Sequence, residues 1–180
     1  MPSPEATAAF TEFVRSRGTA LARTAYLIVG DAHRSEDVLQ AALTETYLRW
    51  HQLRQPEAAE AYVRKAIVTT NASWWRRRAS SELPRDVVPD GSLPDRADEL
   101  VERHAVLDLL RQLSPRQRAV IVLRYFDDLS EYDVAQALGC SVGSVKQHTT
   151  RGLQRLRVLV HDAPDLVPAG LALAAQGSPC

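Results

Sequence analysis

The sequence has few residues of the kinds that support a disulfide framework, a large sheet or a membrane span. Among 180 residues there are two cysteines, Cys140 and Cys180, and 6% of the residues are aromatic. Two cysteines are too few for a disulfide framework or a zinc site, and they fit a reducing cytoplasm. No apolar run reaches the roughly 20 residues that cross a bilayer, and the N-terminus MPSPEATAAF does not resemble a secretion signal. We therefore expect a cytoplasmic protein with no membrane insertion.

Motifs that carry catalysis or bind a metal are also missing. The histidines form neither HExxH nor another metal-ligand spacing, and they stand at His33, His51, His104, His148 and His161. There is no phosphate-binding glycine loop and no nucleophile motif. Asp127 and Asp128 are adjacent, but an acidic loop before a helix explains them better than a metal site. We expect no enzyme, no catalytic residue, no metal and no cofactor.

What the sequence does contain is helix-forming residues and an uneven distribution of charge. Apolar residues make up 45% of the chain, with alanine, leucine, arginine and valine dominant, which favours an all-α fold. The net charge is zero, yet residues 1–78 hold 11 basic and 8 acidic side chains, and residues 101–160 hold 9 and 6. Residues 79–100 between them hold 2 basic and 6 acidic side chains. Two mildly basic blocks thus flank an acidic strip.

Residues 1–78 are predicted to form a bundle of three helices. The first helix has one apolar face, and Gly30 is its expected C-terminal cap. The second helix carries an apolar stripe made of Leu39, Ala42, Leu43, Thr46, Tyr47 and Trp50. After Pro56 a third helix, over about 57–78, is expected to face inward through Val63, Ile67, Thr70 and Trp74. It ends in the aromatic and basic run WWRRR, of which Trp75 is the better candidate for the surface.

The pattern fails after residue 78. Pro84, Pro89 and Pro94 recur among acidic and small residues, so residues 79–100 are predicted to be an extended acidic linker. Its simplest role is that of a tether. The last residues, 161–180, receive no predicted function. The expected organisation is therefore two small helical domains, over 1–78 and 101–160, joined by this linker.

The second block shows helix-turn-helix spacing between Leu129 and Arg157. A helix over about 100–113 comes first, and Ser114-Pro115-Arg116-Gln117 then supplies a capping box for a helix that runs to about 126. Ser130 begins a further helix, whose packing face is Val134, Ala135 and Leu138. Gly139 permits the left-handed backbone of a tight turn, and Ser141 caps a last helix that runs to about 159.

The last helix has the chemistry of a helix that reads duplex DNA. Its inward positions are expected to be Val145, Thr149, Gly152 and Leu156. The outward positions near its start are then Lys146, Gln147, Thr150 and Arg151, whose side chains suit guanine, adenine and phosphate. Residues 141–157 contain four basic residues and no acid. The alternative interpretation is a solvated basic helix on a small helical domain, which the ordered capping signals disfavour.

Two segments resemble a known family. LSPRQRAVIVLRYFDDLSEYDVAQALGCSVGSVKQHTTRGLQRLR resembles region 4 of the extracytoplasmic-function (ECF) sigma factors of the sigma-70 superfamily. RTAYLIVGDAHRSEDVLQAALTETYLRW resembles their region 2.1–2.2, and AYVRKAIVTTNASWWRRR their region 2.3–2.4. The resemblance runs from about residue 10 to 158 and looks closest to the actinobacterial SigE-type subgroup. Two matches in the right order are more specific than either one.

The resemblance implies a role for each block. It implies that the first binds the β′ subunit of core RNA polymerase through Glu36, Asp37 and Gln40. The same block would capture and melt the −10 element through Thr69, Asn71, Trp75, Arg76, Arg77 and Arg78. The second would read the −35 element of promoter DNA through Lys146, Gln147, Thr150 and Arg151, with Arg155 on phosphate. The linker would lie in the polymerase channel that later holds RNA. The partners implied are the β′ and β subunits, promoter DNA and, as a further candidate, an anti-sigma factor.

Several positions depart from the family pattern. The family commonly has asparagine where this chain has Thr69, aspartate at Ser73 and an acid at Ala41. His148 and Thr149 stand where arginine and leucine are common. These departures bear on −10 base preference rather than on the class of protein. The alternative function is a helix-turn-helix transcriptional regulator that does not bind core polymerase as a sigma subunit.

Overall fold

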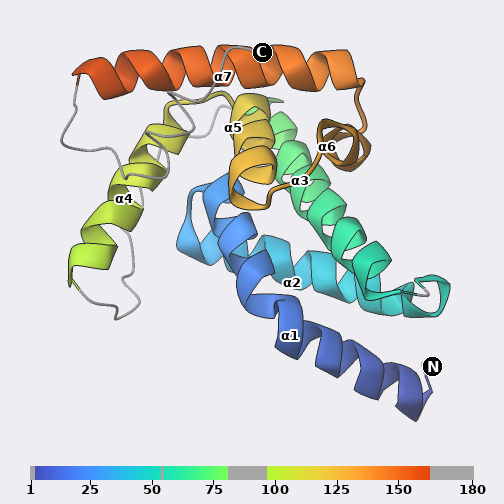
Figure 1. Cartoon of the computed structure of the whole chain (residues 1–180). Helices are drawn as coiled ribbons and strands as arrows, with labels where there is room; N and C mark the ends of the chain where they lie inside the picture. The colour runs from blue at the N-terminus through green and yellow to red at the C-terminus, as the bar shows by residue number, and fades with distance from the viewer. Residues whose placement is uncertain (1–2, 54, 81–96, 163–180) are drawn as a thin grey trace. The chain divides into compact units, whose positions relative to one another are not determined.

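The computed structural model describes residues 3–53, 55–80 and 97–162, and within these ranges it contains helices and no strand (Figure 1). This confirms the all-α prediction. None of the described helices is both long and apolar enough to cross a membrane. In chain order the elements are α1 (Pro4–Val29), α2 (Ala32–Leu48), the 3-10 turn η1 (Trp50–Gln52), α3 (Pro56–Ser80), α4 (Ala97–Arg111), α5 (Pro115–Ile121), the π-helical stretch η2 (Val122–Phe126), α6 (Glu131–Leu138) and α7 (Val142–Asp162).

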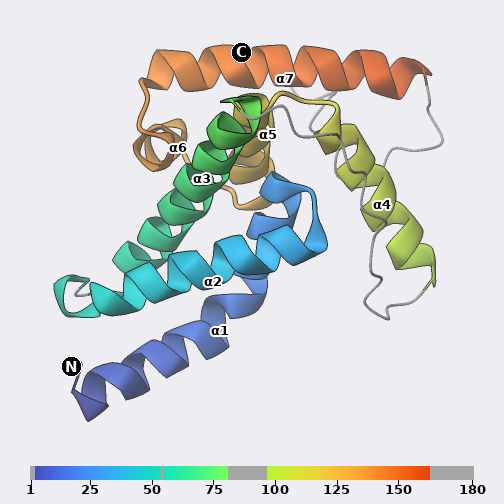
Figure 2. The same cartoon turned by 180° about the vertical axis from the view of Figure 1, so that it is seen from behind.

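The chain divides into two compact units, the first of which contains α1, α2 and α3. Ser3 caps α1 at its start, and Gly30 ends it with a left-handed φ of 80°, as the sequence predicts. Asp31 then caps α2 by accepting a hydrogen bond from the Arg34 backbone N–H at 2.8 Å. One glycine and one aspartate thus reverse the chain within two residues, and the three helices pack on one another (Figures 1 and 2).

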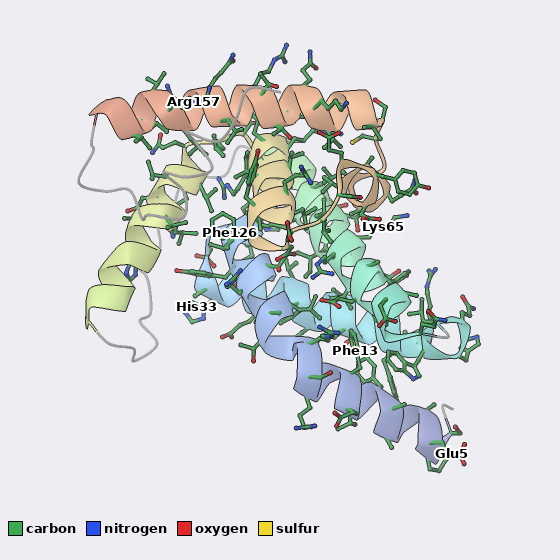
Figure 3. The ribbon with its side chains drawn as sticks, viewed as in Figure 1. Glu5, Phe13, His33, Lys65, Phe126 and Arg157 are labelled. Atoms are coloured by element: carbon green, nitrogen blue, oxygen red, sulfur yellow. The ribbon has the colours of Figure 1, made fainter. Side chains whose placement is uncertain are left out.

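The core of the first unit comes from the predicted apolar faces. Its largest fully buried side chains are Leu21, Ile28, Val63 and Ile67, each at most 1% exposed. An aromatic cluster extends this core toward the start of α1, where Phe13 lies between α1 and the end of α2 (Figure 3). Phe10 is 4.9 Å from Tyr47 and 5.2 Å from Trp50, between ring centroids. These contacts set the position of α2 against α1.

The second unit contains α4, α5, η2, the first turn of α6 and the whole of α7. The capping box predicted at Ser114 is confirmed, with Ser114 Oγ accepting from the Gln117 N–H at 3.3 Å and Gln117 Oε1 accepting from the Ser114 N–H at 3.2 Å. The short helix α5 that begins there packs against α7, and both views show the two helices running in clearly different directions (Figures 1 and 2). The core side chains, each at most 1% exposed, are Leu107, Leu110, Val120, Ile121, Val122, Leu123, Val134, Val145 and Leu156.

The helix that begins at Pro115 changes its winding before it ends. Residues 122–126 form a π-helical stretch, in which the Asp127 N–H donates to the Val122 carbonyl at 3.1 Å. Two bonds tie this stretch to the chain that follows it. Arg124 donates to the carbonyl of Leu129, and the Leu129 N–H donates to the Leu123 carbonyl at 3.0 Å. The sequence predicts one regular helix to about residue 126, so the wider turn is a structural finding.

Two sequence expectations lie largely outside the described residues. Residues 81–96 of the expected linker and residues 163–180 of the expected tail are among them. The described helices stop at Ser80, resume at Ala97 and end at Asp162. The domain limits of 1–78, 79–100, 101–160 and 161–180 stay predictions.

Candidate nucleic-acid interface

The helix-turn-helix begins at a serine cap on each of its two helices. Ser130 Oγ accepts from the Asp133 backbone N–H at 3.1 Å and donates to the carboxylate of Asp133 at 2.6 Å. Ser141 Oγ accepts from the Ser144 N–H at 3.1 Å, and the two serine hydroxyls lie 2.9 Å apart. Each cap satisfies a backbone donor that the first turn of a helix leaves without a partner. Local chemistry thus fixes where α6 and α7 start.

The turn between α6 and α7 depends on Gly139. Its φ of 62° lies in the left-handed region, where a side chain costs conformational energy, although a Cβ placed there would meet no atom within 4 Å. The Cys140 N–H donates to the Ala135 carbonyl at 3.1 Å and closes the end of α6. This is the tight turn that the sequence predicts at Gly139.

One face of α7 is packed, and the predicted inward residues form it. Val145 is 0% exposed and Leu156 is 1% exposed, while Gly152 is also buried. Thr149 is half-buried and donates from its hydroxyl to the Val145 carbonyl at 2.9 Å. Against this face lies α5. In α6, Val134 is 0% exposed. Of the predicted packing face of α6, Val134 and Ala135 are buried and Leu138 is half-buried.

The opposite face of α7 carries the predicted DNA-binding side chains, and all five are exposed. They are Lys146, Gln147, Thr150, Arg151 and Arg155. Figure 3 shows nitrogen-tipped side chains standing off α7 on the side away from α5. No acidic residue occurs in α7 before Asp162. The structure therefore brings these five residues to one accessible cationic surface, and their contact with DNA stays a prediction.

An acidic side chain from α6 meets this surface, which sequence reasoning missed. Glu131 Oε2 lies 3.6 Å from Lys146 Nζ, and the two side chains are 36% and 65% exposed. Glu131 stands in the first turn of α6, where a carboxylate also complements the positive end of the helix dipole. The sequence separation of residues 131 and 146 does not predict this contact, because they lie on different helices that only the turn brings together.

His148 is a second residue whose environment the sequence does not reveal. It is half-buried on α7, next to the outward set. Burial first, and then repulsion by Arg116 of α5 and Arg151 of α7, lower the pKa of its imidazole. Arg116 and Arg151 thus add to the positive field along this edge of α7, and His148 stays neutral more readily than an exposed histidine.

The residues implied for the −10 element lie on α3, in different environments. Thr69 is exposed and donates to the Lys65 carbonyl at 3.0 Å, whereas Asn71 is only 4% exposed. Trp74 is half-buried beneath Arg34, whose Cζ lies 3.9 Å from the centroid of the Trp74 ring. α3 continues to Ser80, but the side chains of Trp75, Arg76, Arg77 and Arg78 lie outside the described set.

The polar face predicted on α2 is accessible. Glu36, Asp37 and Gln40 are exposed on it. The same helix buries Ser35, Val38, Ala42 and Thr46, each at most 6% exposed. The helix is therefore amphipathic in the sense predicted, with two carboxylates and an amide left free for a partner.

Candidate metal ligands do not gather in the part of the chain that the structure describes. No three histidine, cysteine, aspartate or glutamate side chains there form a group that could hold an ion. Cys140 is a free thiol, half-buried in the turn of the helix-turn-helix. The outward residues of α7 carry arginine, lysine, amide and hydroxyl groups, which suit a polyanion.

Comparison with protein families and solved structures gives a matching family model and similar folds. Residues 103–156 match the family model "Sigma-70, region 4". The fold resembles the sigma factor RpoE of Bartonella quintana, solved with the anti-sigma factor NepR, with a TM-score of 0.69 and 20% identity over 86% of this chain and 98% of that one. It also resembles CnrH, solved with the cytosolic domain of CnrY, with a TM-score of 0.61 and 24% identity over 87% and 90% of the two chains.

Curated relatives carry the similarity across most of the chain. The RNA polymerase sigma-E factor of Streptomyces avermitilis is 40% identical over 148 residues, which cover 82% of this chain and 83% of that protein. The ECF RNA polymerase sigma factor SigL of Mycobacterium tuberculosis is 31% identical over 151 residues, or 78% and 82% of the two chains. The matched lengths exceed the helix-turn-helix unit, so they include the first unit as well. The chain belongs to the ECF sigma factors of the sigma-70 superfamily.

Proposed function

We propose that this chain is the promoter-recognition subunit of RNA polymerase, with the helix-turn-helix reading the −35 element and the α1–α3 unit binding core polymerase and the −10 element. The observation that carries the proposal is the exposed face of α7. Lys146, Gln147, Thr150, Arg151 and Arg155 are all exposed there, on a helix whose other face is packed. A helix held in this way can enter the major groove of DNA, which admits one helix and presents base edges.

The side chains on α7 divide the work between bases and phosphates. Lys146 and Arg151 can donate to guanine N7 and O6, and Gln147 can pair with adenine. Thr150 already donates its hydroxyl proton to the Lys146 carbonyl at 3.0 Å, so its oxygen is left to accept a bond. Arg155, one turn further along the helix, is better placed to bind phosphate and fix the register.

Strand opening at the −10 element has to be driven by binding energy, because the proposed sigma subunit hydrolyses no nucleotide itself. Unpairing and flipping a base costs a few kcal/mol, and stacking on an aromatic side chain returns about 1–3 kcal/mol per base. Trp74 is already covered on one face by Arg34. Trp75 and the arginines after it are therefore the stronger candidates for stacking and for phosphate binding along the single strand.

The exposed acidic face of α2 is the proposed contact with the β′ subunit. Glu36, Asp37 and Gln40 supply two charged acceptors and an amide on one side of a packed helix. Such a surface steers and selects a basic partner more than it adds raw affinity. The proposal also places the protein in the cytoplasm and gives it no catalysis of its own. An anti-sigma factor, of the kind bound to the RpoE of Bartonella quintana, is a further partner under this proposal.

The alternative of a helix-turn-helix regulator is less well supported. A regulator would need only its DNA-binding half to resemble sigma factors. The similarity to the Streptomyces avermitilis protein spans 148 residues, more than the 80 residues from 101 to 180 can hold. The first unit is therefore part of the likeness, and it carries the proposed polymerase contacts.

Run-off transcription tests the proposal. Core RNA polymerase from the same organism is mixed with the purified chain and a library of genomic fragments, and transcripts are mapped to their start sites. A promoter-specific sigma subunit gives transcripts from a subset of fragments that share two sequence elements upstream of the start. A regulator gives no transcript with core polymerase alone, and that result would refute the proposal.

A further inference from the structure

Glu131 is the acidic residue that the helix-turn-helix brings to the exposed face of α7. Its Oε2 is 3.6 Å from Lys146 Nζ, the first of the proposed base-reading side chains. The other acid of α6, Asp133, accepts a bond at 2.6 Å from the hydroxyl of its own helix cap, Ser130. Within residues 129–160, all of which the structure describes, Glu131 is thus the carboxylate paired with a proposed DNA contact.

The stability of the protein does not account for this pair. Both side chains are well exposed, at 36% and 65%, and such ion pairs contribute little to the free energy of folding. The place of Glu131 in the first turn of α6 favours any acidic residue, whichever way its side chain points. The ion pair between Glu131 and Lys146 is therefore better explained by a role in DNA binding.

A carboxylate next to the phosphates of DNA is repelled, and it competes with them for Lys146. A lysine alone is a flexible point charge that binds any phosphate within reach. Held by Glu131, its ammonium group has one direction already occupied and fewer orientations left. We propose that Glu131 is a positioning residue that keeps Lys146 from backbone phosphates and directs it to base edges. As a result, α7 binds DNA less tightly overall but discriminates better between DNA sequences. This inference rests on the proposed function.

Equilibrium binding of holoenzyme to two duplexes tests the inference. One is a promoter fragment from the run-off library, and the other is a mixed-sequence duplex of equal length, each titrated across a series of KCl concentrations. For Glu131→Gln we expect binding to the mixed-sequence duplex to tighten about fivefold near physiological salt, with a slope of log affinity against log salt steeper by about 0.9, as for one added phosphate contact. Promoter affinity changes less, so the ratio of specific to non-specific affinity falls.

A matched variant separates position from charge. Asp128→Asn changes the net charge by the same amount, three residues away, at an exposed position whose φ of 52° asparagine tolerates. We expect it to leave both the salt slope and the affinity ratio close to those of the wild type. An equal effect of the two variants would mean that net charge alone acts, and the inference would be overturned.

The double variant Glu131→Gln with Lys146→Met shows whether the glutamate acts through the lysine. If it does, Glu131→Gln changes neither slope nor ratio in the Lys146→Met background. A change of the same size in both backgrounds would overturn the inference and point to a direct contact of Glu131 with DNA. If wild-type holoenzyme does not distinguish the two duplexes, the proposed function fails together with the inference. If it does and Glu131→Gln behaves as wild type, only the inference fails.

Discussion

Gly152 of α7 faces Ile121 of α5 so closely that a Cβ on the glycine would lie 3.1 Å from Ile121 Cγ1 and 3.3 Å from its Cδ1. Ile121 is 1% exposed and surrounded by the core, so it has little room to move away. The absence of a side chain at Gly152 therefore sets how near α7 approaches α5. This contact places the packed face of α7 and, with it, the exposed face on the other side.

The variant Gly152→Ala should destabilise the second unit in spite of alanine's higher helix propensity. Overpacking a core typically costs about 1–3 kcal/mol, against a gain of about 1 kcal/mol from replacing a helical glycine. We expect a net loss of about 1 kcal/mol, measured by urea denaturation. Gly143→Ala on the same helix is the control, because its nearest atom is Ser141 Oγ at 3.8 Å. Equal stability of Gly152→Ala and wild type would show that the Ile121 side chain can shift to make room for the added methyl group.

Arg34 and Trp74 form the corresponding contact in the first unit. Besides its stacking on Trp74, Arg34 donates from Nη2 to the Val29 carbonyl at 2.7 Å, so one side chain joins the α1–α2 corner to α3. Arg34→Met removes a charged hydrogen bond and a cation–π contact, and we expect a loss of about 2 kcal/mol in the free energy of unfolding. The exposed Arg15, paired with Glu12, is the control, and Arg15→Met should leave the unfolding midpoint unchanged. Similar unfolding midpoints for Arg34→Met and Arg15→Met would contradict the stabilising role of Arg34.

His148 predicts a pH dependence of stability with a definite sign. Burial and the nearby Arg116 and Arg151 lower its pKa in the folded protein, so the unfolded chain takes up the proton first. Stability is unaffected above the unfolded pKa of about 6.5 and falls as the pH drops below it. The urea midpoint of wild type should therefore fall more steeply between about pH 7.5 and pH 5.5 than that of His148→Gln.

A second variant checks the cause of that pH dependence. Arg116→Gln removes one of the two repelling charges, so the folded pKa of His148 should move back toward its ordinary value. The loss of stability on acidification should then be shallower than in wild type. Parallel pH profiles for wild type, His148→Gln and Arg116→Gln would show that His148 does not contribute.

The proposed core-polymerase contact can be separated from the fold. Glu36 and Asp37 are exposed on α2, so charge reversal to lysine should not disturb packing. We expect Glu36→Lys with Asp37→Lys to weaken association with core polymerase at least tenfold, measured by fluorescence anisotropy of labelled chain. The thermal midpoint should stay within a few degrees of wild type. Unchanged affinity for core polymerase would remove α2 from the proposed interface.

The features that the sequence predicted well are those that neighbouring residues determine. Ser114 and Gln117 form their capping box through atoms three residues apart, and Gly30 and Gly139 take the left-handed φ that their positions require. The inward and outward faces of α7 follow from helical periodicity, so Val145 and Lys146 are placed correctly. These signals need no knowledge of tertiary structure.

The features that the sequence could not predict depend on contacts between elements. Glu131 meets Lys146, and Arg116 comes near His148, only because the turns and the α5–α7 packing bring them together. The π-helical stretch that begins at Val122 has no composition signal, because its residues are ordinary helix and strand formers. Asn71 was predicted to contact the −10 element because of its position in the matching segment, but its side chain is almost fully buried. The helical periodicity of α3 did not predict this burial.

The most direct test of the account is transcription by holoenzyme carrying Lys146→Ala with Arg151→Ala, measured together with core association of the same variant. Both side chains are exposed, so the fold and the α2 surface should be unaffected. We predict that run-off transcripts from promoters found with wild type fall at least tenfold, while the variant still co-elutes with core polymerase. Full transcription by the variant, or loss of its association with core polymerase, would contradict the division of labour between the two units.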